Sequence, residues 1–143
     1  MHCNDDCCAG GDETINTLVN LGSVVQGISV GLDMNGIPAV SFFNGASATL
    51  QIARCTTPSC TGFVSIDTLD SDSPTGLYTS LQFCGGPFDL PTISYYGLLN
   101  QDLMVTCSLN PEAQSNAPSI APLPCDNIVV DDFTAPDVGR FTS

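Results

Sequence analysis

Short runs of alternating apolar and polar residues, separated by Gly, Pro, Asn and Asp, make up most of this 143-residue chain. β-Branched and aromatic residues dominate the runs, which is typical of β-strands, and the residues between them are turn formers. No window sustains an apolar period of about 3.6 residues, so we expect helices to be scarce. In the first half of the chain the pattern predicts four strands, at residues 27–32, 38–43, 49–55 and 62–69.

One stretch of this pattern occurs twice. Residues 36–43 (GIPAVSFF) return as residues 89–96 (DLPTISYY), and the sequence LQIARC at 50–55 returns as the shorter LMVTC at 103–107. An internal period of about 50 residues is typical of an array in which one supersecondary unit is stacked repeatedly. We therefore expect two repeated four-stranded units.

The repeat also predicts where each unit begins and ends. Residues 76–80 (GLYTS) return as residues 139–143 (GRFTS), which indicates that a further unit starts there. We expect four parts: 1–26 as the end of a preceding repeat, 27–78 as the first repeat, 79–138 as the second repeat with an enlarged loop at 108–124, and 139–143 as the start of a following repeat. On this interpretation the chain is a slice of a longer array, or a unit that partner chains complete.

Four antiparallel strands in a unit of about 50 residues match a β-propeller blade. The small residues Gly27, Ser29 and Gly31 suit the innermost strand, where neighbouring blades crowd together. The pairs Phe42–Phe43 and Tyr95–Tyr96 place one ring on each face of a sheet, because side chains alternate along a strand. The fold prediction is all-β with repeated four-stranded blade-like units. A β-sandwich is the alternative.

The pattern GxPxVSFF, then LxIAxC, then a second Cys five residues on and finally GxYTS resembles blade-like repeats of secreted and cell-surface bacterial proteins. The resemblance covers nearly the whole chain and rests on turn and hydrophobic positions. It implies propeller architecture with a binding or scaffold role, and it carries no catalytic residue. The second copy departs from the pattern at 84–88 and in the enlarged loop.

The charge of the chain limits its partners. Fifteen acidic residues stand against two arginines, which gives a formal net charge of −13. Nucleic acids and anionic membranes need a basic surface, so we expect neither as a partner. No apolar run is long enough to span a membrane, which predicts no membrane insertion.

Eight cysteines favour an oxidising, extracellular or cell-surface location. The repeat predicts equivalent local disulfides Cys3–Cys8 and Cys55–Cys60. Because Cys107 is interpreted as the counterpart of Cys55, it also predicts Cys107–Cys125 across the enlarged loop. Cys7 and Cys84 remain unassigned, with three fates open: pairing with each other, staying as thiols, or bonding to another chain. A zinc site from the N-terminal cysteines and His2 is the weaker alternative, because the other copies lack His.

Catalytic chemistry has little support in this sequence. The only histidine, His2, lies near the terminus, so a His-based triad is not expected, and we predict that the chain is not an enzyme. No cofactor is expected beyond a possible calcium ion. Its candidate ligands are Asp70, Asp72, Asp131 and Asp132, which ordinary turn hydrogen bonding also explains.

Tyr78, Tyr95 and Tyr96 are the candidate ligand contacts, with packing between units as the alternative for these rings. The leading functional hypothesis is a non-enzymatic, secreted β-repeat segment that acts as a binding or scaffold module. Its expected partners are copies of itself or further blades. A carbohydrate- or calcium-dependent adhesion module and a fragment of a larger propeller enzyme are the two alternatives.

Overall fold

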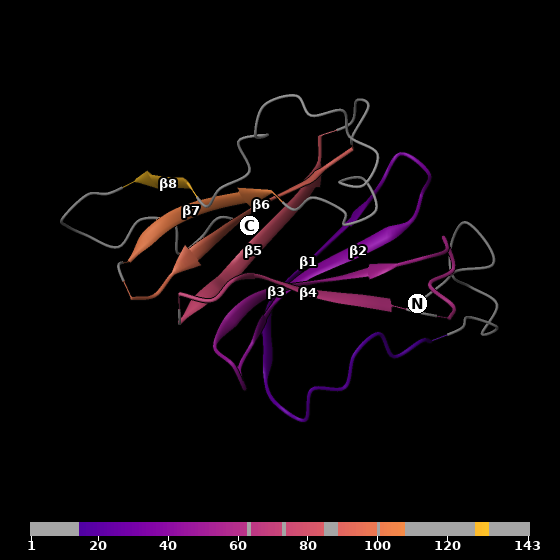
Figure 1. Ribbon diagram of the computed structural model, residues 1–143, viewed down its shortest axis with the longest axis horizontal. Helices are drawn as coiled ribbons and strands as arrows, with labels where there is room; N and C mark the ends of the chain where they lie inside the picture. Colours follow the sequence, from indigo (N-terminus) through magenta and orange to yellow (C-terminus); the bar gives the residue numbers. More distant parts are fainter. Residues whose placement is uncertain are drawn as a thin grey trace, which may run out of the picture.

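The computed structural model describes residues 15–62, 64–72, 74–84, 89–99, 101–107 and, for the backbone alone, 128–131. These residues form two four-stranded antiparallel sheets, each with its strands in chain order (Figure 1). The first sheet contains β1 (Val25–Leu32), β2 (Pro38–Asn44), β3 (Thr49–Cys55) and β4 (Val64–Asp70). The second contains β5 (Thr75–Phe83), β6 (Pro91–Gly97), β7 (Asp102–Cys107) and β8 (Ile128–Asp131).

The all-β prediction is confirmed, since the described part of the chain contains no helix. Within the same residues there is no helix long and apolar enough to cross a membrane. The four strands predicted in the first half are present, with ends shifted by at most two residues. The turn between β1 and β2 is stabilised by Asp33, whose carboxylate accepts hydrogen bonds from the backbone N–H groups of Asn35 (2.8 Å) and Ile37 (2.7 Å).

The two sheets pair their strands in the same way. Corresponding cross-strand partners are similar in kind, as in Ser29–Ser41 and Ser80–Ser94, and in Leu32–Pro38 and Phe83–Pro91. The first strand of each sheet has an irregularity at a corresponding place, where Gly27 (φ 56°) and Tyr78 (φ 53°) adopt left-handed backbone conformations. We call residues that occupy the same place in the two registers matched positions.

The third and fourth strands match as well. The register shifts between Leu50 and Gln51 in β3, and between Leu103 and Met104 in β7. One prediction needs correction, because Cys107 pairs with Thr92 in the way that Arg54 pairs with Ala39. The missing residue in the second copy therefore puts Cys107 at the position matched to Arg54, one place before that of Cys55.

The sheets stack face to face, with β5 packed against β1 and β2 at their junction (Figure 1). The core between them consists of side chains from both sheets: Ala39, Leu50, Ile52, Leu81, Ile93 and Tyr95, with Leu69, Phe83 and Met104 at its margin. The predicted boundary between residues 78 and 79 falls inside β5, and the break between the sheets is the link from β4 to β5.

Candidate binding surface

The face of β1 that points away from the second sheet carries a row of exposed apolar side chains. Ile28, Val30 and Leu32 are 64%, 64% and 61% exposed. They alternate with Gly27, Ser29 and Gly31, which face the second sheet and are half-buried. Exposed apolar side chains that are contiguous on one sheet face are typical of an interaction surface. We call these three residues the β1 row.

The β1 row matches a buried row in the second sheet. By register, Leu81 corresponds to Val30 and Phe83 to Leu32. Leu81 is only 6% exposed, because it packs on the first sheet. The β1 row was not predicted as a surface, although the alternation of small and large residues along 27–32 was the signal for it.

The junction between β1 and β5 shows how the buried row of β5 packs on the small residues of β1. The backbone N–H of Leu81 donates a hydrogen bond to Ser29 Oγ (3.0 Å). Gly31 leaves room for Leu81, since a Cβ there would lie 2.2 Å from Leu81 Cδ2. Small residues on the first sheet therefore make room for large apolar residues from the second.

A polar cluster lies beside these apolar contacts. The Thr79 hydroxyl donates to the carbonyl of Gly27, and Ser41 Oγ donates to Thr79 Oγ1 (3.0 Å). Both hydroxyl side chains are buried. Because a buried hydroxyl without a partner destabilises the fold, this cluster favours one alignment of the two sheets.

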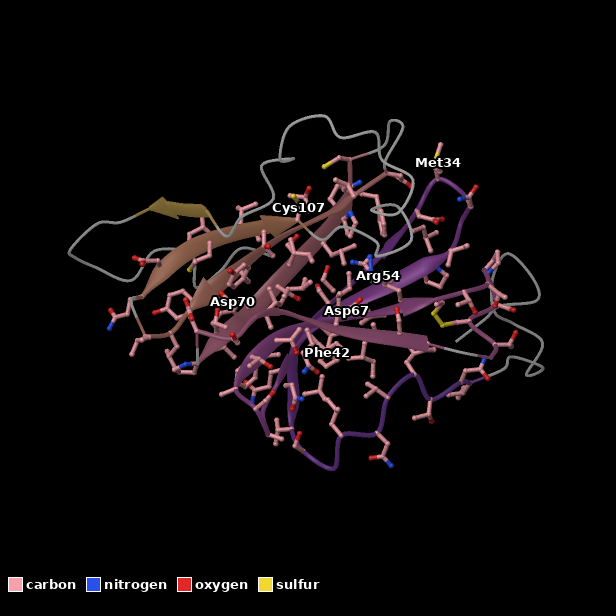
Figure 2. All side chains as sticks on the ribbon, viewed as in Figure 1. Met34, Phe42, Arg54, Asp67, Asp70 and Cys107 are labelled. Carbon is pink, nitrogen blue, oxygen red and sulfur yellow. A yellow bond between two sulfur atoms is a disulfide. The ribbon has the colours of Figure 1, made fainter. Side chains whose placement is uncertain are left out.

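Asp70, at the end of β4, links the two sheets by hydrogen bonds. It is buried and lies near their junction in Figure 2. One carboxylate oxygen, Oδ2, accepts hydrogen bonds from Tyr95 OH (2.7 Å) and Thr75 Oγ1 (3.0 Å). The other oxygen, Oδ1, accepts the backbone N–H of Asp72 (2.9 Å). Burial, followed by the hydrogen bond to Asp70, raises the pKa of Tyr95 well above its usual value.

The calcium candidates are thus only partly described. Asp70 uses both oxygens within the fold, Asp131 is placed by its backbone alone, and Asp132 lies outside the described residues. In the described part of the chain no group of three or more His, Cys, Asp or Glu side chains is arranged to hold a metal ion.

The arginine of β3 lies beside an acidic residue of β4. Arg54 Nε is 3.6 Å from Asp67 Oδ2, and the two side chains lie close together in Figure 2. Burial lowers the pKa of Arg54, and the nearby Asp67 charge opposes that shift. We interpret this pair as a structural cross-strand contact on the face that packs toward the second sheet.

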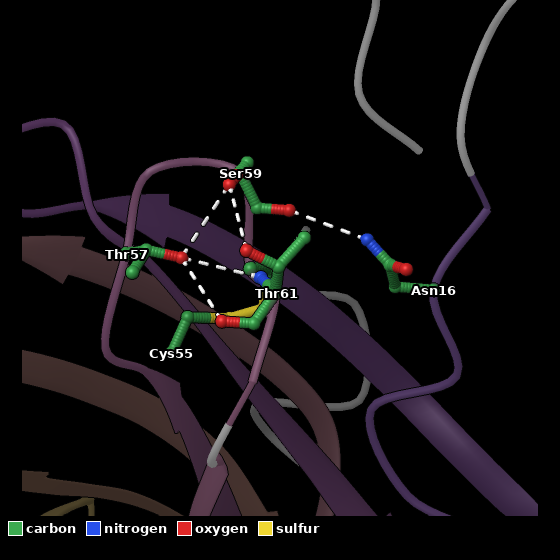
Figure 3. Close-up of a disulfide and its surroundings, with 6 residues drawn as sticks. Asn16, Cys55, Thr57, Ser59 and Thr61 are labelled. Atoms are coloured by element: carbon green, nitrogen blue, oxygen red, sulfur yellow. Dashed lines mark hydrogen bonds between the residues drawn. A yellow bond between two sulfur atoms is a disulfide. The ribbon is translucent and has the colours of Figure 1, made fainter.

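The Cys55–Cys60 disulfide is present and closes the turn that follows β3 (Figure 3). Inside the turn Thr57 Oγ1 accepts the backbone N–H of Thr61 (3.2 Å). Asn16 Nδ2 donates to the carbonyl of Ser59 (3.3 Å). The turn therefore anchors the segment that precedes β1.

The other cysteines are described in part. Cys107 is disulfide-bonded, and its predicted partner Cys125 lies outside the described residues. Cys84 is an exposed thiol whose Sγ lies 2.9 Å from Thr92 Oγ1. Cys3, Cys7 and Cys8 also lie outside the described residues, as does His2.

The three tyrosines differ in exposure. Tyr95 is fully buried between the sheets and Tyr96 is 3% exposed, so these rings pack within the fold and present no face to a ligand. Tyr78 is half-exposed, with its ring centroid 6.3 Å from that of Tyr96. Of the three candidates, Tyr78 alone is open to solvent.

Comparison with known proteins does not assign this chain to a family. No family model, curated protein or solved structure matches it.

Proposed function

We propose that this chain is a non-enzymatic β-repeat module with a binding or scaffold role, in an array completed by further units or by other copies of itself. The observation that carries the proposal is the stack of two sheets with the same strand order and matched registers. The two sheets also share a local backbone feature, because the first strand of each has its irregularity at a matched position, Gly27 or Tyr78. Stacked repeat units of this kind bury their apolar faces against their neighbours.

The exposed β1 row supports the same role. It lies on the face that a preceding unit would cover, and a large exposed apolar row favours association. The Cys55–Cys60 disulfide supports an extracellular or cell-surface location, since disulfides persist in oxidising compartments.

The test is the mass of the purified, unreduced chain by light scattering over a range of micromolar concentrations. The proposal predicts masses at multiples of the 14.9 kDa chain, with the larger species gaining at higher concentration. A well-folded chain that keeps a mass of 14.9 kDa at every concentration would contradict it.

A further inference from the structure

We propose that the β1 row binds the outward face of the second sheet of another copy, so that copies associate head to tail. This inference rests on the proposed role as an array unit and specifies its interface. The partner face is formed by four of the β5 and β6 side chains that point away from the first sheet: Ser80, Gln82, Thr92 and Ser94.

An interface of this kind is already present within the chain, between β5 and β1. There Leu81 and Phe83 of β5 approach the small residue Gly31 of β1. The β1 row presents Val30 and Leu32 at the positions matched to Leu81 and Phe83, but on a face that is open to solvent. One half of the internal interface is therefore repeated in an exposed form.

The other half is repeated as well. The residues that receive β5 are Ser29, Gly31, Ala39 and Ser41, and their matched positions are Ser80, Gln82, Thr92 and Ser94. Three of these four are small, and Gln82 is exposed with a flexible side chain that can turn aside for the shorter Val30. Ser80 occupies the place of Ser29, whose hydroxyl accepts the Leu81 N–H in the internal interface.

The segment before β1 leaves this surface open. Ser23 Oγ donates to Asn44 Oδ1 (3.3 Å) and the Gly45 N–H donates to the Val24 carbonyl (2.9 Å). With Asn16 at Ser59, these contacts hold residues 16–24 along the first sheet, where the trace runs below it in Figure 1. The β1 row remains more than half exposed beside that segment.

A head-to-tail contact joins two different surfaces. An open assembly of this kind therefore has one free β1 row at one end and one free partner face at the other. This property separates it from a two-fold contact, in which the β1 row would face another β1 row. The distinction can be tested with variants that block one surface each.

The experiment uses Val30→Asp to block the β1 row and Ser94→Asp to block the partner face, with mass measured by sedimentation velocity. Both positions keep solvent access in the single chain, so the fold should tolerate the charge. Asn20→Asp is the matched control, because it adds the same charge at an exposed site outside β1, β5 and β6. Ile28→Asp and Gln82→Asp are the second variants of each surface if either first choice lowers the melting temperature.

The inference predicts that each blocked variant alone has the 14.9 kDa mass of one chain and that an equal mixture forms a dimer of one copy of each. The control should assemble like the unmodified chain. If Ser94→Asp still assembles while Val30→Asp does not, the β1 row pairs with itself and the inference is overturned. Assembly that neither variant weakens also overturns it, because another surface is then responsible. An unmodified chain that never assembles contradicts the proposed function itself.

Discussion

Gly27 lies where the backbone of β1 comes close to the backbone of β5. Its φ of 56° favours glycine, and a Cβ at this position would lie 2.5 Å from the backbone nitrogen of Tyr78. Because the nearest atom belongs to a backbone, no side-chain rotation relieves the contact. The close approach of the sheets thus depends on the absence of a side chain here.

We predict that Gly27→Ala lowers the free energy of unfolding by about 3 kcal/mol, through the left-handed backbone and the displaced sheet. Gly36→Ala is the matched control. Gly36 also has a positive φ (73°), but a Cβ added there would have no neighbouring atom within 4 Å. It should cost about 1 kcal/mol, from the backbone alone. Urea unfolding measures both, and equal losses would contradict the role of Gly27 in packing.

Tyr95 gives a second residue-scale prediction, in its response to alkaline pH. Its pKa in the folded chain is raised above the ordinary value of 10.0 by burial and by the hydrogen bond to Asp70. Above pH 10 the unfolded chain therefore loses a proton that the folded chain retains, and the free energy of unfolding falls as pH rises. At lower pH this contribution to stability is fully present.

Tyr95→Phe should remove that part of the alkaline loss and cost about 2 kcal/mol at neutral pH, because a hydrogen bond to a carboxylate is lost. Urea unfolding at a series of pH values, followed by circular dichroism, is the measurement. Tyr78→Phe serves as the half-exposed control and should leave the alkaline loss in place. An unchanged pH profile for Tyr95→Phe would contradict the role of the buried Tyr95 hydroxyl in the alkaline loss of stability.

These residues show what the sequence allowed us to predict. The alternation in 38–43 and 91–96 was sufficient to place one aromatic ring of each pair on either face of its sheet. The bond between Tyr95 and Asp70 was not predictable, since it joins residues of different sheets and depends on how the sheets stack. Asp70 was accordingly considered only as a turn residue or a calcium ligand.

At the scale of the elements, the cysteine turn after β3 links the first sheet to the segment before β1. The disulfide holds Cys55 and Cys60 together, and Ser59 accepts the hydrogen bond from Asn16. The recurrence of two cysteines five positions apart in the sequence predicted the bond. The contact with Asn16 had no sequence signal.

We predict that the double variant Cys55→Ala/Cys60→Ala is less stable by about 2 kcal/mol, the loop-closure estimate for so short a loop. Hydrogen exchange should also rise at residues 16–24, because their anchor at Ser59 is loosened. Asn16→Ala is the partial control, which removes the hydrogen bond and retains the disulfide. Unchanged exchange in both variants would mean that the turn does not hold this segment.

At the scale of the whole molecule, the repeat predicted the composition of each sheet better than it predicted their boundary. Strand order and register recur because the turn and apolar positions recur. The predicted boundary falls inside β5, because GLYTS at 76–80 lies within that strand, on both sides of the division. The number of units in a complete assembly depends on interfaces between copies, which no residue pattern within one copy specifies.

The central claim is that the β1 row of one copy meets β5 and β6 of another. Its most direct test is photo-crosslinking from residue 32, with Leu32 replaced by p-benzoylphenylalanine, because the matched residue Phe83 is also aromatic. Mass spectrometry of the crosslinked dimer should locate the bond at residues 80–82 or 92–94 of the second copy. Crosslinks between the β1 strands of two copies, or crosslinks confined to a single chain, would contradict the account.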